Sequence, residues 1–161
     1  MSLAVWMKYP NPFSAHVLAA DVLSRWVDAQ TGCLHSTRLI LKTGSMPSWI
    51  LSMAKSPDAL VLEESIVDPG RSFMQTRTRN LSHQRWMVVE EVQTYTRNPE
   101  DAGWTLADTR ATIRSNFGKH WAGIAAKMES LGARRLKEHL QKSRQAMGYI
   151  LDKLRARDKI V

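Results

Sequence analysis

The residues that could perform catalysis are few, and their spacing argues against it. The acidic pairs Glu63-Glu64 and Glu90-Glu91 are adjacent within expected strands, so each pair divides between two faces and cannot form a carboxylate dyad. The five histidines are scattered, without metal-ligand spacing. The chain has no Gly-rich phosphate loop, no HExxH pair and no nucleophile elbow. We therefore expect a protein that is not an enzyme and that uses no metal or cofactor.

Cys33 is the only cysteine, which excludes a disulfide framework and a four-cysteine zinc site. It lies two residues from His35 in an expected strand, so the two side chains would share a face. A thiol beside an imidazole is one interpretation of this pair. A small apolar residue in the core is the other, and we adopt it.

Length and composition indicate an ordinary globular domain. The 161 residues correspond to one domain, and we expect a single domain over 1–161. An apolar share of 43% and a charged share of 24% exclude wholesale disorder. No apolar run approaches the roughly 18 residues that would span a membrane.

The formal net charge of +8 is concentrated near the C-terminus. Residues 119–161 hold 11 Lys and Arg against 4 Asp and Glu, whereas residues 1–118 hold 12 against 11. A basic segment of this kind is either a solvated helix face or a surface that docks on phosphates of an anionic membrane or a nucleic acid. We expect membrane docking through Arg134, Arg135 and Lys137. The nucleic-acid alternative lacks the stacked aromatics and Gly-rich basic motif of an RNA-binding sheet.

Alternating and helical periodicities indicate an α+β fold. Strands are expected over 16–28, 33–42, 59–67, 72–82, 86–97 and 104–116, separated by short turn-forming segments. From about 119 to 157 apolar residues recur at three- and four-residue steps, as on one stripe of a long helix that Gly132 could bend. We therefore predict an antiparallel meander of about six strands with a long helix laid across it.

Polar residues occupy both faces of the expected strand 72–82. One face carries Gln75, Arg77 and Arg79, and the other carries Thr76, Thr78 and Asn80. A sheet packed flat against a helix should show one cleaner apolar face. Either a cavity lies between sheet and helix, or one face is open to solvent.

Two connections differ from ordinary loops. The run from Lys8 to His16 contains two prolines and reads as a rigid connector from a helix end into the first hairpin. The connection 46–55 is unusually apolar, so it is either a short helix packed on the core or a mobile lid able to enter a bilayer interface. The lid residues would be Met46, Pro47, Trp49, Ile50, Leu51 and Met53.

Several ordered blocks resemble the PRELI-like family of mitochondrial intermembrane-space lipid-transfer proteins. The first is KYPNPFSAHVL, and further agreement follows at TRLILKTGSMPSW, SIVDP, TRNLSH, VVEE and KSRQAMGYILDKL. The similarity extends from about residue 2 to 155 and favours the phosphatidic acid branch over the phosphatidylserine branch. The family places a further strand and most of a helix before the first block, so we expect one edge strand and part of that helix to be missing here.

The resemblance implies a curved antiparallel sheet of six to seven strands, with a lid and a long C-terminal helix that enclose a lipid pocket. It implies transfer of phosphatidic acid between the outer and inner mitochondrial membranes for cardiolipin synthesis, with peripheral membrane association. It also implies a heterodimer with a small helical protein held by twin disulfides. Lys8, His16 and Lys42 match residues that contact the lipid phosphate, and His139, where relatives often have Asn, completes the expected headgroup site.

Overall fold

The computed structural model describes residues 1–43, 58–116 and 122–158. In this part of the chain the predicted order of elements is confirmed. A short helix, α1 (Ser2–Trp6), and a 3-10 turn, η1 (Pro12–Ser14), precede the sheet. The strands are β1 (Val17–Val27), β2 (Leu34–Thr43), β3 (Asp58–Asp68), β4 (Phe73–Asn80), β5 (Met87–Arg97) and β6 (Thr105–Ser115), and the long helix is α3 (Ala122–Asp158).

The described strands form one antiparallel sheet in chain order, β1 to β6. Turn chemistry of the predicted kind separates them. Gly32 has a φ of 69°, a value that glycine adopts without strain, and its N–H donates to the Asp28 carbonyl at 2.8 Å. The Arg71 N–H donates to the Asp68 side chain at 3.0 Å in the turn after β3. These turns end β1 and β3 and so fix where the neighbouring strands begin.

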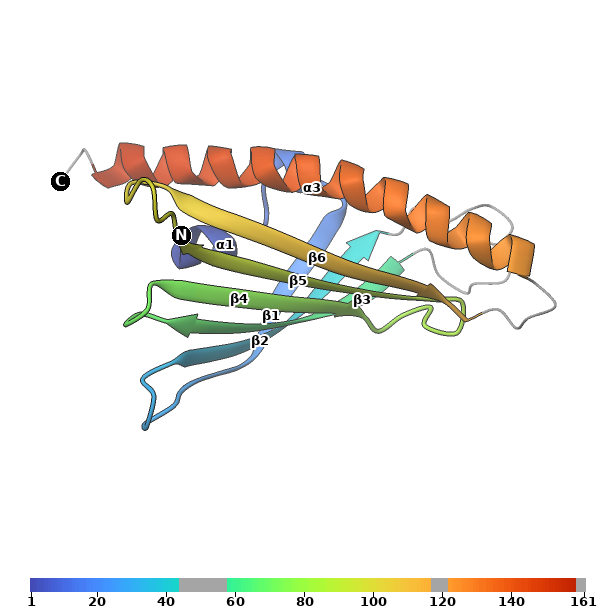
Figure 1. The fold of residues 1–161 in the computed structure, drawn as a ribbon, viewed down its shortest axis with the longest axis horizontal. Coiled ribbons are helices and arrows are strands. Elements are labelled where there is room, and N and C mark those ends of the chain that lie inside the picture. The colour runs from blue at the N-terminus through green and yellow to red at the C-terminus, as the bar shows by residue number, and fades with distance from the viewer. Residues whose placement is uncertain (44–57, 117–121, 159–161) are drawn as a thin grey trace.

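Helix α3 spans the length of the sheet, and α1 lies beneath it (Figure 1). The helix continues through Gly132 without interruption, and a bend at this position stays a prediction. A Cβ built on Gly132 would lie 3.1 Å from the Ile113 side chain and 3.2 Å from Met87 Sδ. The glycine therefore permits close approach of helix and sheet.

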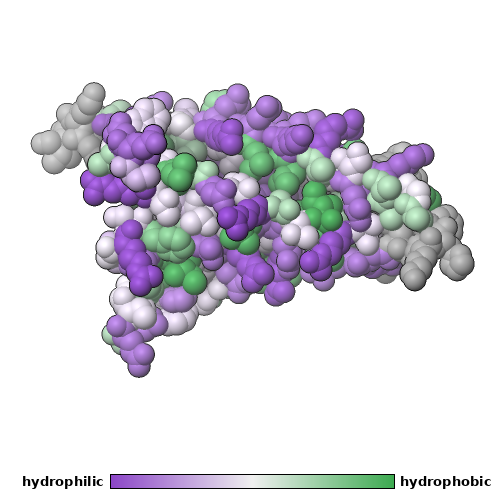
Figure 2. All heavy atoms as spheres, in the orientation of Figure 1, coloured by the Kyte–Doolittle hydropathy of each residue, from purple (hydrophilic) through white to green (hydrophobic). Residues whose placement is uncertain are grey.

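Among the described residues, buried apolar side chains form two clusters between the sheet and the helix. One contains Val5, Met74 and Tyr95, and the other contains Trp86 and Met128. In Figure 2 polar side chains dominate the outward face of α3, while apolar ones gather near its boundary with β6. No helix in the described ranges is long and apolar enough to cross a bilayer.

A cationic pocket between the sheet and the long helix

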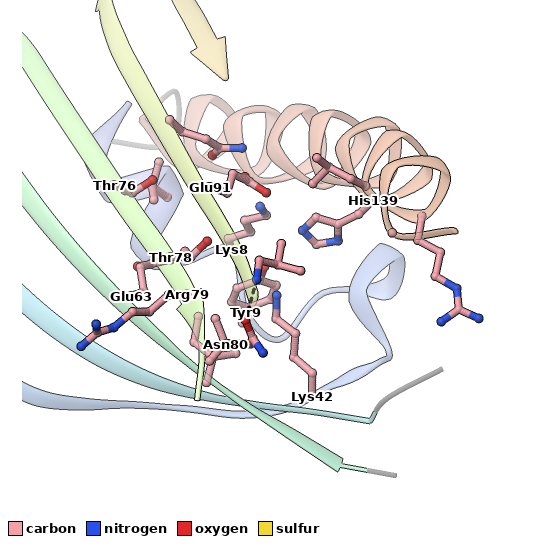
Figure 3. Close-up of a pocket in the computed structure, with 18 of the residues that line it drawn as sticks. Lys8, Tyr9, Lys42, Glu63, Thr76, Thr78, Arg79, Asn80, Glu91 and His139 are labelled. Atoms are coloured by element: carbon pink, nitrogen blue, oxygen red, sulfur yellow. Dashed lines mark hydrogen bonds between the residues drawn. The ribbon is translucent and has the colours of Figure 1, made fainter. Parts of the chain in front are cut away.

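A cavity of about 250 Å³ lies between the two apolar clusters. Its walls come from the connection after α1, from β2 to β5 and from α3 (Figure 3). Strand register places four polar residues in a row across the sheet, because Arg38 pairs with Glu63, Glu63 with Thr78 and Thr78 with Glu91. The polar face of β4 that includes Thr76, Thr78 and Asn80 lines this cavity, so the cavity interpretation is confirmed. On the opposite face Gln75 and Arg77 line a separate groove, whereas Arg79 lines the first cavity together with Asn80.

Lys8 enters the pocket from the connection between α1 and η1. Only 8% of the residue is exposed, and its Nζ donates a hydrogen bond to Ser143 Oγ on α3 at 2.5 Å. The Asn11 side chain donates to the Lys8 carbonyl and accepts a hydrogen bond from the Phe13 N–H at 2.8 Å. Burial, followed by repulsion from Lys42, lowers the Lys8 pKa to about 8. The ammonium is therefore still largely charged at neutral pH.

Lys42 reaches the same pocket from the C-terminal end of β2. Its ammonium makes no hydrogen bond or ion pair with any other described residue. Burial lowers the Lys42 pKa, and the carboxylates of Glu91 and Glu63 partly oppose that shift. An ammonium that faces a cavity and has no direct partner among the described residues is suited to binding an anion.

The two predicted histidines lie together, but only one of them lines the pocket. The His139 ring, on α3, meets the His16 ring edge-on with centroids 5.7 Å apart. Burial and the surrounding ammonium groups lower the pKa of His139 to about 3 and also lower the pKa of His16. Both rings are therefore neutral near pH 7 in the free protein, and His139 can offer a ring nitrogen rather than a positive charge.

Sequence reasoning missed the two carboxylates of the pocket. As predicted, Glu63 and Glu64 divide between faces, because Glu63 lines the pocket and Glu64 lines the groove on the opposite face. However, Glu63 and Glu91 lie on either side of Thr78 in the same row of the sheet, since each pairs in register with it. Spacing within either acidic pair could not reveal this arrangement, because it depends on the alignment of three strands.

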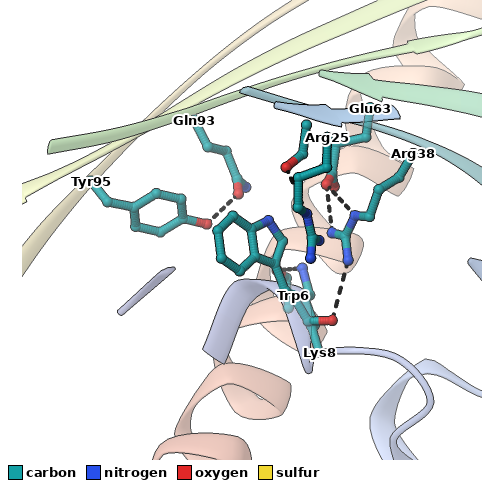
Figure 4. A network of polar contacts seen from close by, with 9 residues as sticks. Trp6, Lys8, Arg25, Arg38, Glu63, Gln93 and Tyr95 are labelled. Carbon is teal, nitrogen blue, oxygen red and sulfur yellow. Dashed lines mark hydrogen bonds and ion pairs between the residues drawn. The ribbon is translucent and has the colours of Figure 1, made fainter. Parts of the chain in front are cut away.

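Glu63 is neutralised where it lies. The Arg38 guanidinium donates two hydrogen bonds to Glu63 Oε1, from Nε at 2.8 Å and from Nη2 at 2.5 Å (Figure 4). Its Nη1 donates a third hydrogen bond to the Trp6 carbonyl at 3.2 Å. Arg38 and Glu63 are 4% and 7% exposed. Sequence reasoning did not identify this buried pair, which joins the sheet to α1.

Comparisons with known proteins identify the family of this chain. A model of the PRELI-like family matches residues 1–157. The chain belongs to the PRELI-like family. Among its relatives, "Protein UPS1, mitochondrial" of Saccharomyces cerevisiae is 39% identical over 155 residues, which cover 96% of this chain and 86% of the relative. Human "PRELI domain-containing protein 1, mitochondrial" is 38% identical over 154 residues, 94% of this chain and 68% of the relative. The "Protein slowmo homolog" of Dictyostelium discoideum is 37% identical over 146 residues, 91% of this chain and 62% of the relative.

Of the three basic residues of this PRELI-like chain that were predicted to dock on membranes, one lines the pocket and two do not. Arg135 is partly buried and lines the pocket, whereas Arg134 and Lys137 are exposed on α3. The three basic residues therefore do not share one outward surface. The expected lid, 46–55, lies outside the described residues, so its assignment stays a prediction, as does the missing edge strand.

The interpretation of Cys33 as a core residue is wrong. Cys33 is partly exposed at the turn before β2. The ring of His35 instead stacks on Trp26, with centroids 4.2 Å apart. Within the described ranges no group of His, Cys, Asp and Glu could hold a metal ion.

Proposed function

We propose that this PRELI-like protein carries phosphatidic acid, without catalysis, between the outer and inner mitochondrial membranes and so supports cardiolipin synthesis. Family membership and the mitochondrial relatives support a lipid-transport role in general. The observation that carries the finer proposal is the pair of ammonium groups, Lys8 and Lys42, in a cavity beneath α3.

The chemistry of the headgroup fits these groups. A phosphate monoester carries about −1.5 to −2 charges near neutral pH and offers three strong acceptor oxygens. Lys8 and Lys42 supply two positive charges, and the Arg38 guanidinium already compensates Glu63. Attraction between charges is stronger here than in water because the surroundings have a low dielectric constant. His139 can add a neutral hydrogen bond.

The walls beside the charged groups are apolar. Val5, Ile40, Val61 and Val89 line the cavity. Its volume of about 250 Å³ is below the roughly 300–1,000 Å³ typical of sites for whole drug-sized ligands, so it fits a headgroup and the adjoining glycerol. Burial of acyl chains would contribute about 0.8 kcal/mol per methylene.

Two further parts of the proposal rest on the family resemblance. We place the protein in the intermembrane space, peripherally bound to membranes, and we propose that it works as a heterodimer with a small helical protein held by twin disulfides. The exposed cations of α3, Arg134 and Lys137, are suited to an anionic membrane surface.

Transfer of fluorescent phosphatidic acid between liposomes tests the proposal, with phosphatidylserine measured in parallel. Lys42→Met should slow phosphatidic acid transfer roughly ten- to hundredfold, because a charge-assisted contact contributes about 1.5–3 kcal/mol. Lys127→Met removes the same charge from an exposed position on α3 and should leave transfer unchanged. Parent-like transfer by Lys42→Met would refute the headgroup assignment. Faster transfer of phosphatidylserine by the parent protein would refute the choice of lipid.

A further inference from the structure

Glu91 is an acidic residue in a pocket suited to anions. It lies on β5 in the polar row of the sheet, and Figure 3 shows its carboxyl group directed toward Lys8 and His139. Glu63, the other carboxylate of the row, is paired with Arg38. Glu91 forms no ion pair with any residue in the described part of the chain. The Gln93 side chain hydrogen-bonds to its carboxylate, which leaves the negative charge in place. That charge repels a fully ionised phosphate and therefore affects which headgroups bind.

A proton between the two acids removes this repulsion. A phosphate monoester has a second pKa of about 6, so it can hold one proton near neutral pH, whereas a diester has no P–OH group. We propose that Glu91 is a specificity-determining residue that selects phosphate monoesters over diesters by sharing one proton with the headgroup. This inference rests on the proposed function, since it assumes that a phosphate lipid occupies the pocket.

Two of the cations that line the cavity act directly on Glu91. Lys42 and Lys8 attract its carboxylate, while the guanidiniums of Arg79 and Arg135 line other parts of the cavity wall. In such a complex the two ammonium charges match ionised Glu91 and a singly charged monoester, whereas a dianionic headgroup beside ionised Glu91 would be repelled. Burial also raises the pKa of Glu91, against the opposing effect of Lys42 and Lys8, and a raised pKa makes the carboxyl a better partner for the proton.

Side chains from α3 and β5 line the cavity beside Glu91 and leave room for a hydrogen bond between its carboxylate and the phosphate. Helix α3 contributes the neutral ring of His139 and the guanidinium of Arg135, and Gln93 lies on the same face of β5 as Glu91. Arg135 only donates, and the Gln93 oxygen already accepts from Tyr95 at 2.6 Å, whereas the neutral ring of His139 has one nitrogen that donates and one that accepts. We assign Glu91 as the acceptor of the P–OH group, because its ionised carboxylate accepts a stronger hydrogen bond than a neutral ring nitrogen does.

Phosphatidylmethanol is the matched probe. It carries one negative charge, as the monoprotonated monoester does, but a methyl group replaces the proton. With identical acyl chains in a liposome transfer assay at pH 6.5, the parent protein should prefer phosphatidic acid by about tenfold or more, the effect of one charge-assisted hydrogen bond. Glu91→Gln should reduce this ratio to about one, mainly by faster phosphatidylmethanol transfer, because the amide can donate to either phosphate.

Glu90→Gln is the control, since Glu90 is adjacent but directed to the opposite face of β5. It should keep the parent ratio. Equal transfer of both lipids by the parent, or a parent-like ratio in Glu91→Gln, would overturn the role of Glu91 while leaving phosphatidic acid transfer intact. Failure of the parent to transfer phosphatidic acid would instead overturn the proposed function. The parent ratio needs no variant, so the test does not depend on whether Glu91→Gln folds.

Discussion

Replacement of Arg38 by methionine should destabilise the protein strongly. Arg38 forms an ion pair with Glu63, with Arg38 Nη2 and Glu63 Oε1 2.5 Å apart. Both side chains are buried, with 5% of Arg38 and 9% of Glu63 exposed. Removing one partner of a buried pair leaves an uncompensated charge and costs about 3–5 kcal/mol. Arg38→Met also removes the hydrogen bond to the Trp6 carbonyl, which connects β2 to α1. The loss is a large part of the roughly 5–15 kcal/mol that holds a typical domain folded.

Urea unfolding at pH 7, followed by far-ultraviolet circular dichroism, measures this loss. Arg110→Met is the matched control, because Arg110 pairs with Asp108 at 3.2 Å in solvent, where such pairs contribute little. Its free energy of unfolding should stay within about 0.5 kcal/mol of the parent value. The double variant Arg38→Met/Glu63→Leu should recover much of the loss, since no buried charge then remains.

Two results would refute this reasoning. One is a loss below about 1 kcal/mol for Arg38→Met, which is no more than an ordinary substitution costs. The other is a double variant as unstable as Arg38→Met alone, because the damage would then come from lost packing rather than from an unpaired Glu63 carboxylate.

Three further predictions concern α3. Burial and the facing ammonium groups lower the pKa of His139 to about 3, so between pH 6.5 and 3 the unfolded chain binds a proton at this ring that the folded chain does not. The free energy of unfolding should therefore fall as the pH drops from 6.5 toward 3. His139→Asn should flatten that part of the profile of unfolding free energy against pH. Gly148→Ala should add up to about 1 kcal/mol in urea unfolding because a Cβ there meets nothing within 4 Å, whereas Gly132→Ala should gain nothing because the sheet is too close. Reversing Arg134 and Lys137 to Glu should weaken binding to cardiolipin-containing liposomes at least tenfold in flotation assays, at about 1 kcal/mol per cation; unchanged binding would mean that this helix face is only solvated.

The sequence alone determined the elements and their order. Turn residues such as Asp28 and Gly32 determine the backbone only within a few positions of the chain. The two-residue alternation of a strand and the three- to four-residue repeat of a helix are local in the same way. The bounds of the strands could therefore be predicted to within a few residues. The family blocks added Lys8, Lys42 and His139 as pocket residues, and the structure brings these three together.

Only the tertiary structure decided what faces these cations. Lys8 reaches Ser143 across 135 positions of the chain, and Glu91 enters the pocket because its strand aligns with Thr78. Alternation along a strand predicts which face a residue occupies, but not which residue of the next strand lies beside it. In the same way, apolar periodicity defines the buried stripe of α3 but not its rotation over the sheet. That rotation directs Arg135 into the pocket and leaves its neighbour Arg134 in solvent.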